Sequence, residues 1–194
     1  MSAAAGGGAG PNPVDISYTP SPFSTKNKLL RVLWTIVWVL LVRPSPKPAV
    51  AWRRAILRAF GAKLGKGAKV AASTRVWAPW NLEMGDHSSM AHSVECYNQG
   101  FIKIGANTTI SQYSHLCAST HDYTKPTLPL VLGRIEIGSG VWICSDAFVG
   151  PDVRIGDGVV VGARSSVFAD LPEWTICVGN SAKPIKLRVV SEGD

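Results

Sequence analysis

The stretch IGSGVWICSDAFVGPDVRIGDGVVVGARSSVFADL, residues 137–171, decides the fold of this chain. An aliphatic residue returns at every sixth position without a slip, at Ile137, Ile143, Val149, Ile155, Val161 and Val167. A helix needs apolar spacing near 3.6 residues and a flat strand needs 2, so a period of six fits neither alone. It fits short strands joined by turns, stacked coil upon coil in a solenoid whose repeats bury their apolar faces on their neighbours.

The same spacing extends toward the N-terminus with two restarts. Each restart comes two residues after an expected aliphatic position, at Met84 and at Ile104. Three hexads make one triangular coil of about 18 residues, with parallel strands stacked along the axis. The alternative is chance spacing in a glycine-rich β protein. The positions that keep the step are Leu64, Val70, Val76, Leu82, Met84, Met90, Cys96, Ile102, Ile104, Ile110 and Leu116.

Two strings within the repeat resemble a known family, IGDGVV at 155–160 and VGARSS at 161–166. They are similar to the hexapeptide-repeat acyltransferases, and the resemblance implies a mainly β fold, a single-stranded left-handed parallel β-helix. Three further strings resemble the branch of sugar O-acetyltransferases associated with colanic acid and other exopolysaccharide synthesis. These strings are WAPWNLEMGD at 77–86, STHDYTKP at 119–126 and GNSAKPIKLR at 179–188.

The resemblance also implies an activity and an assembly. The expected reaction is acetyl-CoA-dependent O-acetylation of a sugar hydroxyl in an exopolysaccharide precursor similar to that of colanic acid. The acceptor is a sugar or a lipid-linked saccharide, two alternatives that the sequence leaves open. The family assembles as homotrimers with the site between neighbouring subunits, so a homotrimer is implied here.

Composition divides the chain into segments. Residues 1–22 are expected to be a disordered N-terminal tail, because the first fifteen are rich in Gly, Ala and Pro and nearly lack large apolar side chains. Apolar and basic helices are expected over 23–62. The β-helix acetyltransferase domain is expected over 63–188, with a loop at 122–134 and a C-terminal tail at 189–194.

Positive charge is concentrated in the N-terminal third. Residues 1–70 contain 11 Lys or Arg and one acid, Asp15, whereas residues 71–194 contain 9 Lys or Arg and 12 acids. A negatively charged partner would therefore meet the N-terminal region. Nucleic acid is not that partner, because the charges interleave with long aliphatic runs and no known nucleic-acid-reading motif occurs.

Residues 29–42 form an apolar helix candidate, with Ser24 or Thr25 as its N-cap and Arg43-Pro44 as its end. At 1.5 Å per residue these fourteen residues form a helix about 21 Å long, shorter than the roughly 20 residues that a bilayer needs. We therefore do not expect this helix to span a membrane. A second helix candidate at 49–60 mixes Trp and aliphatic residues with three arginines.

Two interpretations of this helical pair stay open, and they can coexist. One is peripheral contact of residues 24–60 with an anionic leaflet, on the cytoplasmic face of the plasma membrane. The other is capping of the β-helix end, which terminal repeats require.

The four cysteines indicate a reduced compartment, consistent with a cytoplasmic location. They lie at 96, 117, 144 and 177, no CxxC pair occurs, and Cys96 occupies an inward position of the repeat. Such cysteines behave as small apolar residues. A catalytic thiol is not expected, and the chemistry falls to histidine.

His121 stands where the period breaks. The next aliphatic position, Ile137, comes 15 residues later than the expected position 122, so the intervening segment must loop out of the coil. Long loops on rigid scaffolds carry function. By resemblance the loop folds over the active site and His121 matches the catalytic histidine. A neutral imidazole acting as general base would take the proton of the sugar hydroxyl as it attacks the thioester.

A general base needs an orienting partner, and the developing oxyanion needs a donor. Glu95 and Asn98 lie one coil earlier, in the region where related enzymes place a polar side chain near the histidine. The resemblance gives Ser145 the position whose backbone N–H faces the thioester carbonyl. The adjacent Asp122 is expected to point elsewhere.

The resemblance also implies a coenzyme groove parallel to the helix axis. Its pantetheine portion would pass Ser145 and Ala163. Relatives usually carry a phosphate-contacting lysine where this chain has Ala169, and Arg164 is a candidate to compensate. The residues expected to contact acetyl-CoA are Trp142, Ser145, Ala163, Arg164, Lys183, Lys186 and Arg188.

Two other classes of protein compete with the transferase. The γ-class carbonic anhydrases share the β-helix and bind zinc through three histidines. Here His115 and His121 occupy the same place in successive hexads, and His87 or His92 is available as a third. No metal is expected, because the C-terminal motif and the loop fit the transferase better. The remaining class is a non-catalytic structural β-helix.

Overall fold

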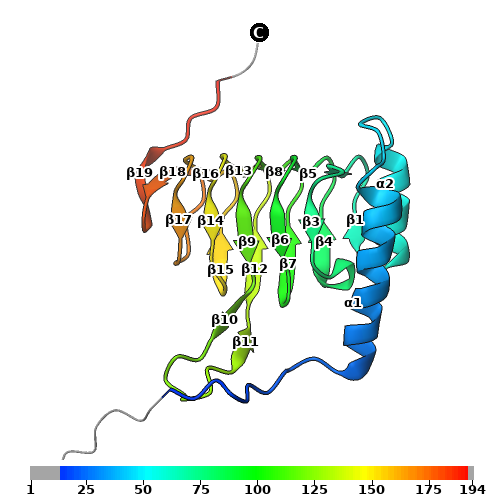
Figure 1. Ribbon diagram of the computed structural model, residues 1–194. Coiled ribbons are helices and arrows are strands. Elements are labelled where there is room, and N and C mark those ends of the chain that lie inside the picture. The colour runs from blue at the N-terminus through cyan, green and yellow to red at the C-terminus, as the bar shows by residue number, and fades with distance from the viewer. Residues whose placement is uncertain (1–13, 192–194) are drawn as a thin grey trace, which may run out of the picture.

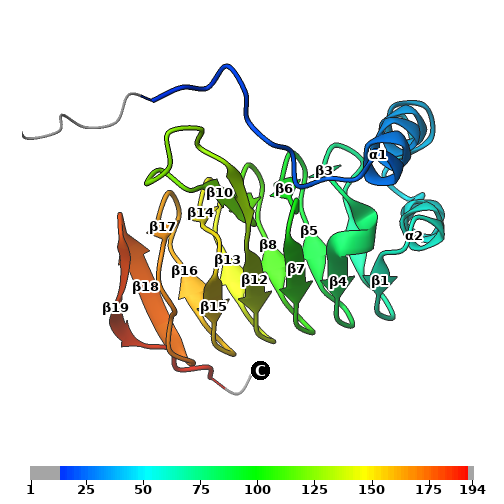
Figure 2. The same cartoon turned by 90° about the horizontal axis from the view of Figure 1, so that it is seen from below.

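The computed structural model describes residues 14–191, which form a triangular β-helix with a helical cap at its N-terminal end (Figure 1). The three sides of the prism are sheets of short parallel strands, which Figure 2 shows from below. The mainly β solenoid predicted from the period of six is therefore confirmed.

We call the three sheets A, B and C, and successive strands of each coil belong to them in that order. Sheet A contains β1 (Lys63–Leu64), β4 (Leu82–Met84), β7 (Phe101–Ile104), β12 (Arg134–Ile137) and β15 (Val153–Ile155). Sheet B contains β2 (Lys69–Val70), β5 (Ser89–Met90), β8 (Thr109–Ile110), β13 (Trp142–Ile143), β16 (Val160–Val161), β18 (Thr175–Gly179) and the antiparallel β19 (Ala182–Leu187). Sheet C contains β3 (Arg75–Val76), β6 (Glu95–Tyr97), β9 (His115–Cys117), β14 (Phe148–Val149) and β17 (Ser166–Val167).

The aliphatic positions of the period line the interior of the prism. All six positions from Ile137 to Val167 are at most 2 % exposed. The residue four places after each of these is buried as well, and Ser165 is the one polar member of that set. Each buried side chain of this size stabilises the fold by about 1.5–3 kcal/mol relative to exposure. The period of six therefore reflects one continuous hydrophobic core.

The two restarts are explained by longer corners. Leu64 lies opposite Met84 and Met84 opposite Ile104, a spacing of 20, whereas Ile137 lies opposite Ile155, a spacing of 18. In the first coil the corner contains a short 3₁₀ helix, η2 (Pro79–Asn81). The two extra residues are absorbed at the corner between sheets C and A, so the strands stay in register.

Two helices cover the first coil, as the capping interpretation predicted. α1 (Thr25–Val37) begins at the N-cap Ser24, whose Oγ accepts from the Asn27 N–H, and it continues as the π-helical turn η1 (Trp38–Val42). α2 (Val50–Ala59) follows and packs on β1 and β2. Trp34 and Leu57 bury their side chains in the core cluster. No helix within residues 14–191 has the length and apolar character needed to cross a bilayer.

The chain leaves the prism between sheets C and A as a hairpin, which we call the loop hairpin. It consists of β10 (Ser119–His121) and the antiparallel β11 (Leu130–Leu132), and it projects away from the coils (Figure 1). The departure comes after the buried Ala118, three residues before the break expected from the sequence. His121 therefore belongs to the hairpin and does not close a hexad.

The N-terminal segment runs along the tip of the loop hairpin. The Asp15 N–H donates to the Pro126 carbonyl and the Thr19 hydroxyl donates to the Thr127 carbonyl, each at 3.0 Å. A disordered tail was predicted over residues 1–22, of which residues 1–13 lie outside the described residues. Residues 14–22 contain no helix or strand and are exposed.

Candidate functional site

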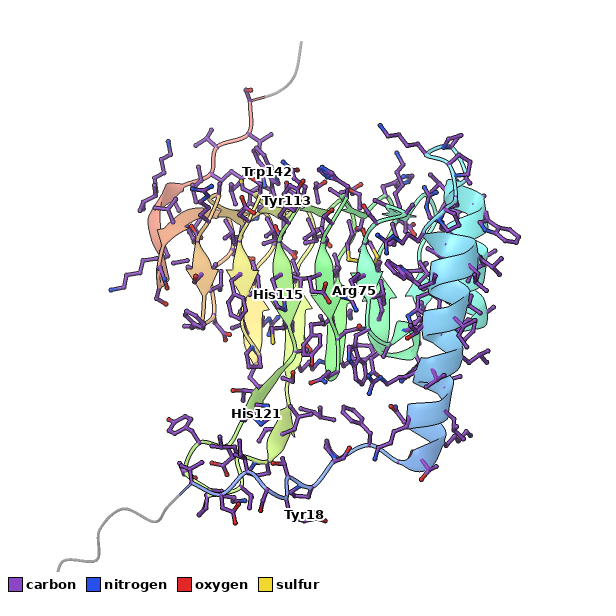
Figure 3. The ribbon with its side chains drawn as sticks, in the orientation of Figure 1. Tyr18, Arg75, Tyr113, His115, His121 and Trp142 are labelled. Atoms are coloured by element: carbon purple, nitrogen blue, oxygen red, sulfur yellow. The ribbon has the colours of Figure 1, made fainter. Side chains whose placement is uncertain are left out.

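His121 is exposed at the end of β10, and one of its ring nitrogens is already engaged. Nδ1 lies 2.6 Å from the carbonyl oxygen of Leu128 on the opposite side of the loop hairpin. A carbonyl oxygen can only accept, so Nδ1 carries the proton and Nε2 keeps its lone pair. This is the tautomer that a general base needs at Nε2. Figure 3 shows His121 on the hairpin, well separated from His115 on sheet C.

Asp122 turns away from His121, as its position in sequence predicted. Its carboxylate accepts from the backbone N–H and the hydroxyl of Thr124. These hydrogen bonds hold the pKa of Asp122 below its ordinary value. The Asp122 N–H donates to the Pro129 carbonyl at 3.0 Å, which ties the two arms of the hairpin together just beyond His121. Asp122 thus shapes the loop.

Glu95 and Asn98, the two candidates for a polar partner, take different places. Glu95 is half-buried on sheet C, opposite His115 in the parallel ladder. Asn98 is fully buried at the next corner, where its amide accepts from the Ala78 N–H and donates to the Ala78 carbonyl. Asn98 therefore joins two coils, and neither side chain is a hydrogen-bond partner of His121 within the described residues.

Sheet C carries a column of polar residues that the sequence interpretation did not connect. Arg75 lies opposite Glu95, and Glu95 lies opposite His115. Burial lowers the pKa of His115, against the opposing charge of Glu95, so its imidazole stays neutral at pH 7. Its Nε2 is enclosed and forms no hydrogen bond within the described region of the chain. The spacing of 20 between the three residues, equal to the length of the early coils, is the signal that could have revealed this column.

Ser145, Ala163 and Arg164 lie together at the corner between sheets B and C. The Arg164 N–H donates to the Ser145 carbonyl at 3.0 Å, so the two turns are stacked one coil apart. The Ser145 N–H forms no hydrogen bond with any residue in the range 14–191. A free backbone N–H at a fixed turn is the kind of donor that stabilises an oxyanion. Ser145 and Ala163, which the pantetheine portion is expected to pass, thus lie one coil apart on the same edge of the prism.

Trp142 and Arg188 line a shallow hollow of about 420 Å³ on sheet B. The Trp142 indole is 49 % exposed and its N–H donates to the Ser111 hydroxyl at 3.0 Å, which fixes the ring orientation. The Arg188 guanidinium donates to the carbonyls of Gly140 and Gly158. Lys183 and Lys186 are exposed on β19 at the C-terminal end. The predicted coenzyme contacts therefore lie along sheet B, with Ser145, Ala163 and Arg164 at its edge with sheet C and Arg188 at its edge with sheet A.

The two halves of the predicted site lie on opposite edges of the prism in one chain. Figure 3 places Trp142 at the upper edge and His121 below the lower one. Sheet C separates the loop hairpin from the corner of Ser145. A base and an oxyanion donor must both reach one thioester carbonyl. Within one chain the predicted base and the predicted oxyanion donor therefore lie at different edges of sheet C.

A zinc site of the carbonic anhydrase type would need three donor side chains together. Among residues 14–191 no group of three or more His, Cys, Asp or Glu side chains is close enough to hold a metal ion. The four cysteines are free thiols, and burial raises the pKa of the Cys96 thiol far above its ordinary value.

Comparison with known proteins agrees with this geometry. The family model described as bacterial transferase hexapeptide (six repeats) matches residues 134–169. The putative colanic acid biosynthesis acetyltransferase WcaF of Escherichia coli (strain K12) is 41 % identical over 173 residues, which cover 89 % of this chain and 95 % of the relative. The chain belongs to the hexapeptide-repeat acetyltransferases.

Solved structures of lower identity share the fold of this acetyltransferase. A maltose O-acetyltransferase from Clostridium difficile 630 has a TM-score of 0.77 at 24 % identity, covering 87 % of this chain and 92 % of the other. A hexapeptide-repeat acetyltransferase from Vibrio cholerae O1 biovar eltor, complexed with acetyl-coenzyme A, has a TM-score of 0.79 at 24 % identity, covering 86 % and 91 %. The family expected from the strings at 155–166 is confirmed, and this acetyltransferase is an enzyme.

Proposed function

We propose that this acetyltransferase moves the acetyl group of acetyl-CoA to a hydroxyl of a saccharide precursor of an exopolysaccharide. The observation that carries the proposal is the His121 ring, whose Nδ1–H is bonded to the Leu128 carbonyl and whose Nε2 is left as a base. The 41 % identical relative is named for colanic acid biosynthesis. A structure of the same fold is a maltose O-acetyltransferase.

His121 then acts at the moment the acceptor oxygen attacks the thioester carbonyl. Nε2 accepts the hydroxyl proton as the C–O bond forms, since a sugar hydroxyl is too weakly acidic to lose it to water at pH 7. The Ser145 N–H donates to the oxyanion of the tetrahedral intermediate. When the C–S bond breaks, the proton passes from His121 to the coenzyme thiolate, and the ester and free coenzyme A leave.

The site is shared between subunits of a homotrimer in this proposal. The loop hairpin of one subunit, with His121, meets the Ser145 edge of its neighbour. Sheet C lies between these two elements within one chain, so a second copy is needed to bring a base to the bound thioester. Glu95 contributes a carboxylate to the binding of the acceptor, because it is half-buried on sheet C, from whose end the loop hairpin departs.

Acetyl-CoA lies along the edge of sheets B and C in the same proposal. Trp142 offers a fixed aromatic wall, and the small Ala163 leaves room for the pantetheine arm. Cations flank sheet B on both edges, with the exposed Arg164 at the edge with sheet C and Arg188 at the edge with sheet A, and Lys183 and Lys186 lie on the C-terminal strand. Cations suit the phosphates of the coenzyme.

The test is acetyl transfer itself. Purified enzyme is incubated with acetyl-CoA and candidate acceptors, both nucleotide sugars and lipid-linked oligosaccharides, and free thiol is measured with time. We expect acceptor-dependent release of coenzyme A and at least about a hundredfold loss of turnover in His121→Ala. Unchanged turnover in His121→Ala, with the fold intact by circular dichroism, contradicts the proposal and favours a non-catalytic β-helix.

Peripheral attachment to the cytoplasmic face of a membrane belongs to this proposal. α1 and η1 expose an apolar face made of Leu29, Val32, Leu33, Ile36, Val39, Leu40 and Leu41, each at least 44 % exposed. Between Ile16 and Leu82 the chain contains 12 Lys or Arg and no acid. An apolar face bordered by cations matches an anionic lipid surface, and it does not match a cationic or neutral one.

Vesicle flotation tests the attachment. The parent protein should float with vesicles containing anionic phosphatidylglycerol, less so in high salt, and stay behind with neutral phosphatidylcholine. The double variant Leu33→Glu/Leu40→Glu should lose flotation, whereas Val189→Glu, which charges an even more exposed apolar residue at the other end of the prism, should not. If the double variant lowers the oligomeric state while the parent binds no vesicle, the face is a protein interface and the attachment is wrong.

A further inference from the structure

A cavity of about 500 Å³ lies between α1 and sheet C, apart from the hairpin and the coenzyme edge. The indole N–H of Trp34 donates to the Val76 carbonyl at 2.7 Å, and that of Trp38 donates to the Thr74 carbonyl at 3.1 Å. These two bonds hold the helix against β3. The two walls of the cavity are therefore fixed by buried hydrogen bonds and do not depend on a ligand.

Two arginines border the cavity with their guanidinium groups stacked on aromatic rings. Arg31 lies 3.7 Å from the centroid of the Trp77 ring, and Arg43 lies 5.5 Å from that of Trp38. A cation–π contact leaves N–H groups of the guanidinium free to donate elsewhere. The two cations are thus oriented, and their donors remain available to something else.

Other arginines in this chain show what a purely structural role looks like. Arg53 is 3 % exposed, and its guanidinium donates to the carbonyls of Val70, Pro46 and Lys47. Neither Arg31 nor Arg43 donates a side-chain hydrogen bond to any residue in the range 14–191. Partial burial lowers the pKa of Arg31, as expected for a cation without compensating partners.

Arg75 adds a third cation, and Glu95 is the one carboxylate in the lining. The Arg75 Nε lies 3.9 Å from a Glu95 oxygen, which is a loose pair, and the Arg75 side chain is 70 % exposed. Three arginines against one glutamate leave the cavity with a net charge of +2. Arginine forks of this kind match the oxygens of phosphate groups.

The rest of the lining suits a sugar. The Tyr97 ring can pack against the apolar face of a pyranose, whereas the Trp77 ring, 6.2 Å away, is already covered by Arg31 and Phe23. The Glu95 carboxylate can accept from hydroxyl groups. Tyr97 lies opposite Cys117, the last residue of sheet C before the loop hairpin begins. The aromatic side of the cavity therefore points along the coil toward the hairpin that carries His121.

We infer that this cavity binds a glycosyl diphosphate, with its diphosphate between Arg31, Arg43 and Arg75 and its sugar against Tyr97 and Glu95. The saccharide component of the inference rests on the proposed function, whereas the anion site does not. Two sources could carry this chemistry, a nucleoside diphosphate sugar or a saccharide on a polyprenyl diphosphate. Val39, on the exposed apolar face of α1 and η1, also lines the cavity, so a lipid tail would have a surface to follow.

Calorimetry with the full-length enzyme tests the anion site and separates its sources. The probes are inorganic pyrophosphate, UDP-glucose, farnesyl diphosphate in detergent, and glucuronic acid. We expect pyrophosphate to bind, and one of the two organic diphosphates to bind tighter than it does. Tighter binding of UDP-glucose identifies the nucleotide source, and tighter binding of farnesyl diphosphate identifies the lipid source.

Matched variants assign the binding to the cavity. Arg31→Gln and Arg75→Gln should each weaken pyrophosphate binding roughly tenfold or more, since each removes charged hydrogen bonds. Arg134→Gln is the control, because Arg134 also stacks on a ring, that of Phe101, but lies on sheet A and pairs with Glu136. Melting temperatures verify the fold, and Arg75→Gln serves if Arg31→Gln disturbs the helix.

Three results overturn the inference. They are the absence of pyrophosphate binding by the parent enzyme, an equal loss in Arg134→Gln, and glucuronic acid binding as tightly as pyrophosphate. Acetyl transfer is scored separately. If His121-dependent transfer is seen while pyrophosphate does not bind, the proposed function stands and only the anion site fails. If pyrophosphate binds as expected while no acceptor is acetylated, the anion site stands and the proposed function fails.

Discussion

The Nδ1–H of His121 donates to the carbonyl oxygen of Leu128 across the loop hairpin, at 2.6 Å. His121 is the first residue after the coil whose side chain can act as a base. Leu128 lies in the turn of the hairpin, and its backbone is left-handed, with φ 43°. It fixes the ring orientation and the tautomer together. The loop hairpin therefore positions its histidine without a carboxylate.

The substitution His121→Asn separates the structural hydrogen bond of His121 from its proposed role as the base. The Asn amide nitrogen occupies the place of Nδ1, so it can still donate to Leu128, but the side chain offers no lone pair at the place of Nε2. We expect turnover to fall by about a hundredfold or more, as in His121→Ala. Hydrogen exchange of the hairpin amides should stay near the parent level in His121→Asn and rise in His121→Ala. Equal turnover in His121→Asn and the parent would show that Nε2 is not the base.

Ser145→Pro removes the backbone N–H proposed as the oxyanion donor. The Ser145 N–H has no partner within the described residues, and the next residue in the turn, Asp146, has φ 58°. The chain already uses Pro151 before Asp152, whose φ is 56°, in an equivalent turn. Proline is therefore compatible with this backbone. We expect kcat to fall by about 10²–10³ with an unchanged melting temperature, as for the loss of an oxyanion donor.

Ser145→Ala keeps the N–H and is the control, so its turnover should stay close to that of the parent.

Mixing inactive His121→Ala with inactive Ser145→Pro tests the shared site. After unfolding and refolding together, mixed trimers should regain some of the parent activity, because some interfaces then combine an intact hairpin with an intact edge. Activity that never exceeds that of the two variants alone contradicts a site between subunits.

The core and the site differ in how far the sequence predicts them. The step of six from Ile137 to Val167 fixes which side chains point inward, because every coil repeats the same register. The sequence interpretation predicted Asn98 as a polar partner of the histidine, although Asn98 follows the inward Cys96 by two residues, and the structure buries it against the Ala78 backbone. A repeat constrains each residue through neighbours at known spacing.

No such spacing exists where the chain leaves the coil. His121 bonds to the backbone carbonyl of Leu128. Every residue type has such a carbonyl, so the sequence does not indicate which residue is the partner. The departure point was predicted three residues late, because the sequence shows that the aliphatic position expected at 122 is missing but does not show where the chain turns outward. The cavity beside α1 joins Arg31 to Arg75, and only the docking of the helix brings these distant segments together.

The enclosed imidazole of His115 should make stability depend on pH. Its pKa is lowered by burial, so in acid the unfolded chain takes up a proton before the folded one does. The stability that comes from keeping it neutral is present above the ordinary histidine pKa of about 6.5 and is lost as the pH falls below it. We expect the melting temperature to decrease from pH 7 to pH 5, and to decrease less in His115→Gln. An identical decrease in both proteins would assign the effect to other groups.

Gly100→Ala should damage the base of the loop hairpin. A Cβ at Gly100 would lie 1.9 Å from the Gly133 carbonyl oxygen and 2.6 Å from that of Ala118, so the backbone must shift where the hairpin leaves and rejoins the prism. Gly150→Ala is the control, since its Cβ would come no nearer than 3.2 Å. We expect Gly100→Ala to lose about 1–3 kcal/mol of stability in denaturant unfolding and to reduce turnover at constant KM for acetyl-CoA, because His121 moves while the coenzyme edge does not. A change confined to KM would place the base of the hairpin in coenzyme binding, contrary to this assignment.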